Sequence, residues 1–156
     1  MRLTPWLGTL ARLVLGTAFV WAGLAKVTDV AGSGRAVALY EIVSPQAARL
    51  IGAELPFVEI ALGILLLIGL GTRVAAVMTA GLLAVYLAAI ASVWARGLSI
   101  GCGCFGGGGT VSSGAALGYL VDIVRDAVLL IAACYLAWRP VTRYGLDRRV
   151  LAVGET

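Results

Sequence analysis

The chain has 156 residues, of which 61% are hydrophobic and only 13% are charged. Its mean hydropathy of +1.00 lies well above that of an ordinary soluble domain, so a lipid bilayer is the first expected partner. The net charge of +4 comes without a basic stripe interleaved with aromatic residues, which argues against nucleic-acid binding. The absence of histidine excludes His-based catalytic triads, bis-His haem sites and Glu-x-x-His di-iron sites within this chain.

Four apolar stretches are each long enough to cross a hydrocarbon core of about 30 Å as a helix. They lie at about residues 7–27, 50–70, 74–95 and 115–138. Strands are a poor alternative, because the runs do not alternate and an open sheet edge is not tolerated in lipid. The sequence therefore predicts an all-α protein, a four-helix transmembrane bundle that forms one membrane domain over residues 1–156, with a polar cytoplasmic tail at 139–156.

The first stretch is expected to be an uncleaved helix, because its apolar run is too long for a secretory signal and contains a charge. It carries Arg12 and Lys26 near opposite ends, and both side chains are expected to snorkel to the membrane interfaces. Gly16 and Gly23 in this stretch, with Gly63 in the second, would allow close helix contact.

The connection at 28–49 is too long to be a plain turn. The glycine-rich residues 32–34 open it, and residues 35–43 are predicted to form a short interfacial helix that stops before Pro45.

Basic residues outside the apolar stretches or close to their ends predict the orientation, because cytoplasmic loops carry the Lys/Arg excess. Six such residues fall on the side of the two termini, and four fall on the opposite side: Arg2, Arg73, Arg139, Arg143, Arg148 and Arg149 against Lys26, Arg35, Arg49 and Arg96. The termini are therefore predicted to be cytoplasmic and the loop between the third and fourth helices extracytoplasmic. Eleven arginines, a single lysine and no asparagine suggest a high-GC bacterium, hence a multi-pass protein of a bacterial plasma membrane.

Charged residues inside the predicted spans indicate a candidate functional site. Glu54 and Glu59 lie in the second stretch, and Asp122, Arg125 and Asp126 follow i, i+3, i+4 spacing in the fourth. Ionisable groups within a membrane are costly and usually face a bundle interior or a wet cavity. One interpretation is a polar chamber that moves protons or holds the head of a quinone. The preferred interpretation is a structural ion-pair network around Arg125.

A glycine-dense loop at 97–109 holds Cys102 and Cys104, separated by Gly103. A disulfide across one residue closes a small, strained ring, which favours thiol–disulfide exchange. A structural disulfide, a metal site and an inert loop remain alternatives. A metal site is disfavoured, because zinc needs four donors and the loop adds only backbone and hydroxyl oxygens.

Two features of the loop's surroundings could favour the thiolate: Arg96 at its entry and the positive N-terminal end of the fourth helix at its exit. The third cysteine, Cys134, lies about 30 Å away along that helix. A disulfide needs Cα atoms within about 7 Å, so Cys134 cannot pair with the loop cysteines and is expected to be a buried packing thiol.

Four elements of the sequence together resemble a known family: AGLAKVTD at residues 22–29, LPFVEIALG at 55–63, CGCFG at 102–106, and Arg125 in the last helix. They are similar to the methylamine-utilisation MauE family within the broader DoxX-like group of four-helix membrane proteins, over about residues 10–138. The resemblance implies a redox-associated membrane protein. One branch is linked to maturation of the disulfide-rich small subunit of methylamine dehydrogenase, and DoxX relatives include quinol-oxidase-associated subunits.

The function expected from these features is that of a membrane thiol–disulfide redox protein. Its Cys102/Cys104 pair would exchange electrons between a secreted or membrane-tethered thioredoxin-fold partner and a membrane carrier, for which a quinone is the candidate. The alternative is a non-catalytic assembly or maturation subunit for a periplasmic redox enzyme such as methylamine dehydrogenase. A small transporter is a weaker third hypothesis, because the chain lacks paired broken helices in matching halves.

Overall fold

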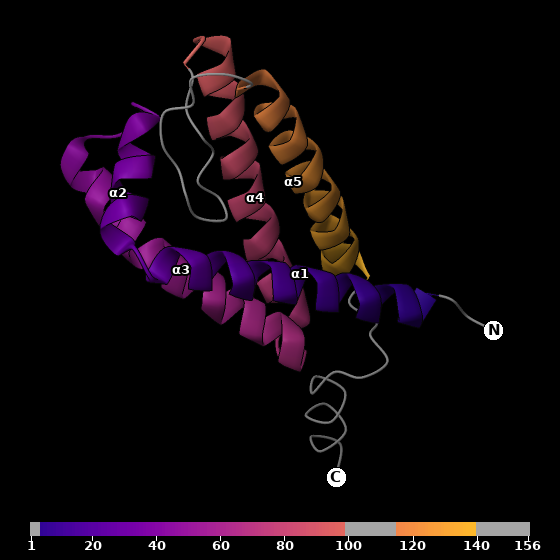
Figure 1. Ribbon diagram of the computed structural model, residues 1–156. Coiled ribbons are helices and arrows are strands. Elements are labelled where there is room, and N and C mark those ends of the chain that lie inside the picture. The colour runs from indigo at the N-terminus through magenta and orange to yellow at the C-terminus, as the bar shows by residue number, and fades with distance from the viewer. Residues whose placement is uncertain (1–3, 99–114, 140–156) are drawn as a thin grey trace.

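The computed structural model describes residues 4–98 and 115–139, and within them the chain is all-helical, as predicted (Figure 1). The helices are α1 (Thr4–Val27), α2 (Val30–Leu39), α3 (Pro45–Ile68), α4 (Thr72–Ala95) and α5 (Ala115–Trp138). In the described part of the chain, α1 from Trp6 onward, α3 and α4 are long and apolar enough to cross a membrane. Helix α5 is equally long, but it carries three charged residues. A fourth crossing by α5 stays a prediction.

The segment between α1 and α3 differs from the expected loop. Helix α2 begins at Val30, directly after Asp29, whose carboxylate accepts a hydrogen bond from the Gly32 amide at 2.7 Å. The glycine-rich residues 32–34 are therefore helical, and the predicted 35–43 helix lies about five residues too late. Helix α2 does end before Pro45, but α3 begins at Pro45 and not at about residue 50, because Ser44 caps the first turn and proline fits the first helical position.

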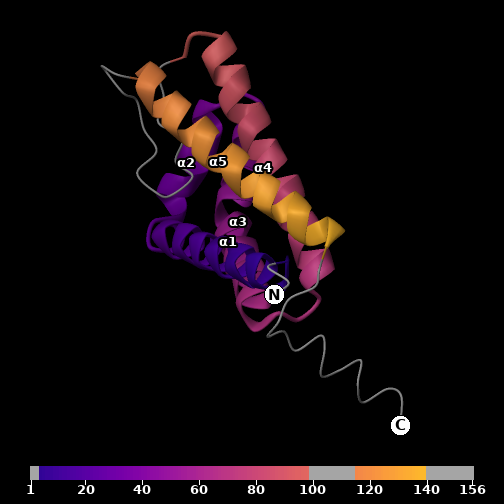
Figure 2. The ribbon, with the colours of Figure 1, turned by 90° about the vertical axis from the view of Figure 1, so that its right-hand side faces the viewer.

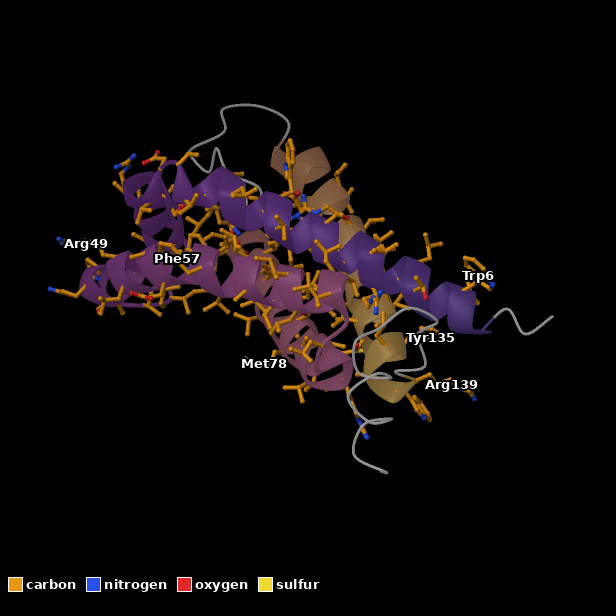
Figure 3. All side chains as sticks on the ribbon, turned by 90° about the horizontal axis from the view of Figure 1, so that it is seen from below. Trp6, Arg49, Phe57, Met78, Tyr135 and Arg139 are labelled. Carbon is orange, nitrogen blue, oxygen red and sulfur yellow. The ribbon has the colours of Figure 1, made fainter. Side chains whose placement is uncertain are left out.

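Helices α1 and α3 form an antiparallel pair that packs backbone to backbone, and Figure 3 shows them side by side. A Cβ added at Gly63 would lie 2.8 Å from the Gly16 carbonyl oxygen, and one added at Gly23 would lie 2.7 Å from the Pro56 carbonyl oxygen. Both distances are shorter than side chains tolerate, so the predicted close helix contact at these glycines is confirmed.

Helices α4 and α5 form a second antiparallel pair, inclined to α1 in both ribbon views (Figures 1 and 2). The hydrophobic core lies where the two pairs meet. Its buried residues are Leu15, Phe19, Leu62, Leu66, Ala75, Ala76, Leu83, Leu129, Ala133 and Leu136. Helix α2 packs on α3 instead, where a Cβ at Gly52 would lie 2.4 Å from the Gly34 Cα.

Large apolar side chains cover much of the outer surface, as expected where lipid replaces water. Trp21 is 68% exposed, and Val85 and Ile131 are exposed as well. The surface also carries Cys134. The prediction of a buried packing thiol at this position is wrong, because Cys134 lies on the face of α5 turned away from the core residues Ala133 and Leu136.

Candidate functional site

Three helices bring one ion pair and one hydroxyl group together inside the protein. Lys26, near the end of α1, places its Nζ 2.5 Å from Oε1 of Glu59 in the middle of α3. The side chains of Lys26 and Glu59 are only 6% and 1% exposed. Tyr86 of α4 donates its hydroxyl hydrogen to the same carboxylate oxygen, and its ring lies 5.2 Å from Lys26 Nζ in a cation–π arrangement.

The expected snorkelling of Lys26 and Arg12 is therefore wrong. Both residues are buried, with exposed fractions of 6% and 3%. Lys26 has a carboxylate within reach inside the protein, and a paired charge needs no route to the interface.

Helix α5 supplies a second set of charges. Arg125 lies 2.8 Å from Asp122 through Nη1 and 2.9 Å from Asp126 Oδ1 through Nε. Asp126 is 1% exposed, whereas Arg125 is 30% exposed at its side chain. The expected ion-pair network around Arg125 thus includes the two aspartates, but Glu59 pairs with Lys26 instead.

The two sets meet at a small cavity of about 10 Å³ between the helix pairs. Glu59, Tyr86 and Asp126 line it, together with apolar residues of α1, α4 and α5. In the following, Lys26, Glu59, Tyr86, Asp122, Arg125 and Asp126 are called the polar cluster. All four long helices contribute to the polar cluster, so its geometry depends on how the two helix pairs cross.

A larger, mainly apolar cavity of about 180 Å³ adjoins the polar cluster. Lys26 and Tyr86 belong to its lining, so these two residues connect the apolar cavity with the polar cluster. The other lining residues come from α2, α3, α4 and the α2–α3 connection: Ser33, Ala36, Val37, Tyr40, Ile42, Val43, Ile51, Gly52, Leu55, Val85 and Ala89. Such a space suits a lipid-soluble molecule with one polar group.

Tyr40, which follows α2, adds a second phenol to this lining. Burial and the nearby Asp122 carboxylate raise the pKa of Tyr40 to about 12. The Tyr40 hydroxyl is therefore protonated at physiological pH and can act as a hydrogen-bond donor.

Arg96 lies at the end of α4, where the segment with the cysteines begins. Its guanidinium donates through Nη2 to the backbone carbonyl of Tyr40, and Nη1 lies 3.9 Å from the Glu41 carboxylate. Glu41 has φ of 52°, a left-handed conformation that is unusual for a residue with a side chain. Arg96 thus fastens the α2–α3 connection to the end of α4.

The remaining residues singled out from the sequence fall into two groups. Cys102 and Cys104 lie outside the described residues, so their contacts remain a prediction. Glu54 is described, and its side chain is exposed on α3, away from the buried carboxylates. The structure adds Lys26, Tyr40 and Tyr86 as residues of the site. A lone lysine in a chain with eleven arginines was the signal for Lys26; no sequence pattern marks the two tyrosines.

Comparison with curated proteins and comparison with solved structures both found no match to this chain. Comparison with protein families matched residues 4–139 to the family described as methylamine utilisation protein MauE. This range covers every helix that bears the polar cluster and also the cysteine segment. The wider resemblance to the DoxX-like group stays a prediction. Because the match spans most of the sequence, the chain belongs to the MauE family.

Proposed function

We propose that the protein is a membrane thiol–disulfide redox protein, with Cys102 and Cys104 as the reacting pair. In one direction the thiolate of one cysteine attacks the disulfide of a thioredoxin-fold partner, and the other cysteine then attacks the mixed disulfide and releases the partner as a dithiol. In the reverse direction a partner thiolate attacks the Cys102–Cys104 disulfide, and the partner leaves as a disulfide while Cys102 and Cys104 become thiols. Oxidation of the two thiols to a disulfide releases two electrons and two protons. A quinone accepts the same number when it becomes a quinol, so a quinone balances the reaction.

The apolar cavity beside Lys26 and Tyr86 is the observation that carries this proposal. Its walls suit a hydrocarbon ring or tail, whereas the ammonium of Lys26 can donate to an oxygen acceptor. Lys26 has three N–H donors and directs one to Glu59, so donors remain for a ligand carbonyl.

The proposed orientation places the termini in the cytoplasm and the cysteine segment outside a bacterial plasma membrane. Support comes from the excess of basic residues on the side of the termini. Figure 3 shows Trp6 and Arg139 toward one end of the molecule and Arg49 at the opposite end, as this assignment requires. Disulfides form and persist in extracytoplasmic compartments, which suits a thiol pair on that side.

A trapping experiment tests the thiol chemistry. Cys102→Ser and Cys104→Ser are expressed singly and together, and Cys134→Ser is the matched control. Removal of the resolving cysteine, for which we expect Cys104, should leave a mixed disulfide that appears on a non-reducing gel as a heavier band and disappears on reduction. The control should show no such band.

A second experiment tests the apolar cavity separately. Ala89 of α4 lines the cavity, so Ala89→Trp should fill it and abolish quinone reduction by the dithiol form of the purified protein. Ala88 is exposed on the same helix and is not part of the lining, so Ala88→Trp serves as the control and should leave the rate unchanged. Equal rates in both variants would remove the cavity from the proposal.

The competing function is that of a non-catalytic assembly or maturation subunit for a periplasmic redox enzyme, and the description of the family as a methylamine utilisation protein agrees with it equally well. In that case a Cys102–Cys104 disulfide would only hold a docking segment in shape. Both single variants and the double variant would then lose stability to the same extent, and no adduct would form. If the double variant also supported normal periplasmic disulfide formation, the assembly function would replace the redox proposal.

A further inference from the structure

Two buried carboxylates of the polar cluster each use only one of their oxygens. Glu59 engages Lys26 and Tyr86 through Oε1, and Asp126 engages Arg125 through Oδ1. Among the described residues, Glu59 Oε2 and Asp126 Oδ2 are buried and have no hydrogen-bond partner. Each residue is 1% exposed, and both line the small cavity. Glu59 and Asp126 thus line the same small cavity, and each has one buried acceptor oxygen without a donor, which costs free energy unless a donor is present.

The formal charges of the polar cluster do not balance. Lys26 and Arg125 supply two positive charges, against three negative charges from Glu59, Asp122 and Asp126. An uncompensated charge in a poorly solvated interior is expensive, and one added proton would make the cluster neutral. Asp122 is the least suitable acceptor of that proton, because its side chain is 22% exposed and lies 2.8 Å from Arg125.

Charged and hydroxyl-bearing side chains from several helices surround the carboxylates of Glu59 and Asp126. Lys26 faces them from α1, Tyr86 from α4, and Asp122 and Arg125 from α5, while Tyr40 contributes a phenol from the end of α2. Arg12 belongs to a different part of α1, about 21 Å from Lys26 along the helix. No other cation of the described residues is recorded in an ion pair with Glu59 or Asp126.

We propose that Glu59 and Asp126 form a buried proton-binding site, in which the pair holds one exchangeable proton between Oε2 and Oδ2. The proton supplies the donor that both oxygens lack and the positive charge that the cluster lacks. The small cavity, at about 10 Å³, is at the lower limit for one water molecule, which could complete the bridge between the oxygens. Any larger occupant is excluded by this volume.

Tyr86 connects this proton site to the apolar cavity. Its side chain lines both spaces, and its hydroxyl donates to Glu59. A phenol can accept one proton as it donates another, so Tyr86 would pass protons between the apolar cavity and Glu59, and the proposed shared proton would extend this path to Asp126. The inference does not depend on the thiol chemistry, because it uses only charges and contacts within the helices.

Infrared spectroscopy of the full-length protein in lipid nanodiscs tests the proposal, because a protonated carboxyl group has a carbonyl stretching band that an ionised one lacks. At neutral pH the wild type should show such a band, and the band should shift in heavy water and disappear as the pH is raised. Glu59→Gln and Asp126→Asn should each abolish it, because either substitution neutralises the cluster without the extra proton. Both amides retain the shape of a protonated carboxyl, so folding should be preserved.

Glu54→Gln is the matched control, since Glu54 is an exposed carboxylate on the same helix as Glu59. The band should persist in this variant. A band that disappears in Glu54→Gln but survives in the other two variants would place the proton elsewhere and overturn the proposal. Complete absence of the band from the wild type would overturn it regardless of how the variants behave.

Discussion

Replacement of Lys26 by methionine should destabilise the protein more than any other single change in the polar cluster. Methionine has a similar length and no charge, so the substitution removes the partner of Glu59 with little change in volume. The Glu59 carboxylate would then be 1% exposed and without a cation at 2.5 Å. Leaving one partner of a buried pair uncompensated typically costs about 3–5 kcal/mol.

The cost has an upper limit, because Glu59 can take up a proton instead of remaining charged. Protonation of an ordinary glutamate at pH 7 costs about 4 kcal/mol, so we expect a loss of about 3–4 kcal/mol in the free energy of unfolding. This limit falls by about 1.4 kcal/mol for each unit by which the pH is lowered. The deficit of Lys26→Met relative to wild type should therefore shrink in acid.

The double variant Lys26→Met/Glu59→Gln separates charge from shape. It removes both charges but keeps an acceptor for the Tyr86 hydroxyl, so its stability should return to within about 1 kcal/mol of wild type. Unfolding by sodium dodecyl sulfate in mixed micelles, followed by circular dichroism, provides the free energies. Arg35→Met is the control, because the pair of Arg35 with Asp29 is exposed and should contribute at most about 1 kcal/mol. Equal losses in the single and double variants would show that Lys26 acts through packing and not through its charge.

The other predictions concern helix packing, hydrogen bonding and topology. Gly63→Ala should destabilise the α1–α3 pair in the same unfolding assay, because its Cβ would meet the Gly16 carbonyl oxygen, whereas Gly81→Ala meets nothing within 4 Å and should be neutral or stabilising by up to about 1 kcal/mol. Tyr86→Phe should cost only about 0.6 kcal/mol, the average for a hydrogen bond between membrane helices, and a loss above about 2 kcal/mol would contradict this assignment. In intact cells under reducing conditions, a membrane-impermeant maleimide should label single-cysteine variants that retain Cys102 or Cys104 but not one that retains Cys134; the opposite pattern would invert the proposed topology.

Much of the fold could be predicted from hydrophobicity alone. Long apolar runs define helices whatever they pack against, so the existence and type of α1, α3, α4 and α5 followed from the sequence. The predictions of the start of α3 and of the position of α2 were wrong. The caps of these helices, at Ser44 and Asp29, are local contacts between a side chain and the backbone, and hydropathy contains no information on them. A proline such as Pro45 is typical of the residues after a helix end, but it also suits the first position of a helix.

The candidate site was predictable only in part. Glu59 and Asp126 were predictable as site residues, because charged residues within a membrane span are rare and usually have a partner. The ion-pair partner of Glu59 depends on which helices are neighbours in the fold. The sequence suggested Arg125 of α5, whereas the structure shows Lys26 of α1. The apolar cavity depends further on the side-chain packing of α2, and no periodicity in the sequence encodes that packing.

The contact of Arg96 with the Tyr40 carbonyl connects the end of α4 to the segment between α2 and α3. Arg96 is the residue after α4, just before the segment that leads to the cysteines, and Tyr40, Ile42 and Val43 form part of the wall of the apolar cavity. A displacement of Arg96 would therefore act on that wall through the backbone of Tyr40. If another protein docked next to Arg96, the contact of Arg96 with Tyr40 would change the shape of the apolar cavity. A ligand in the cavity would affect the position of Arg96 through the same contact.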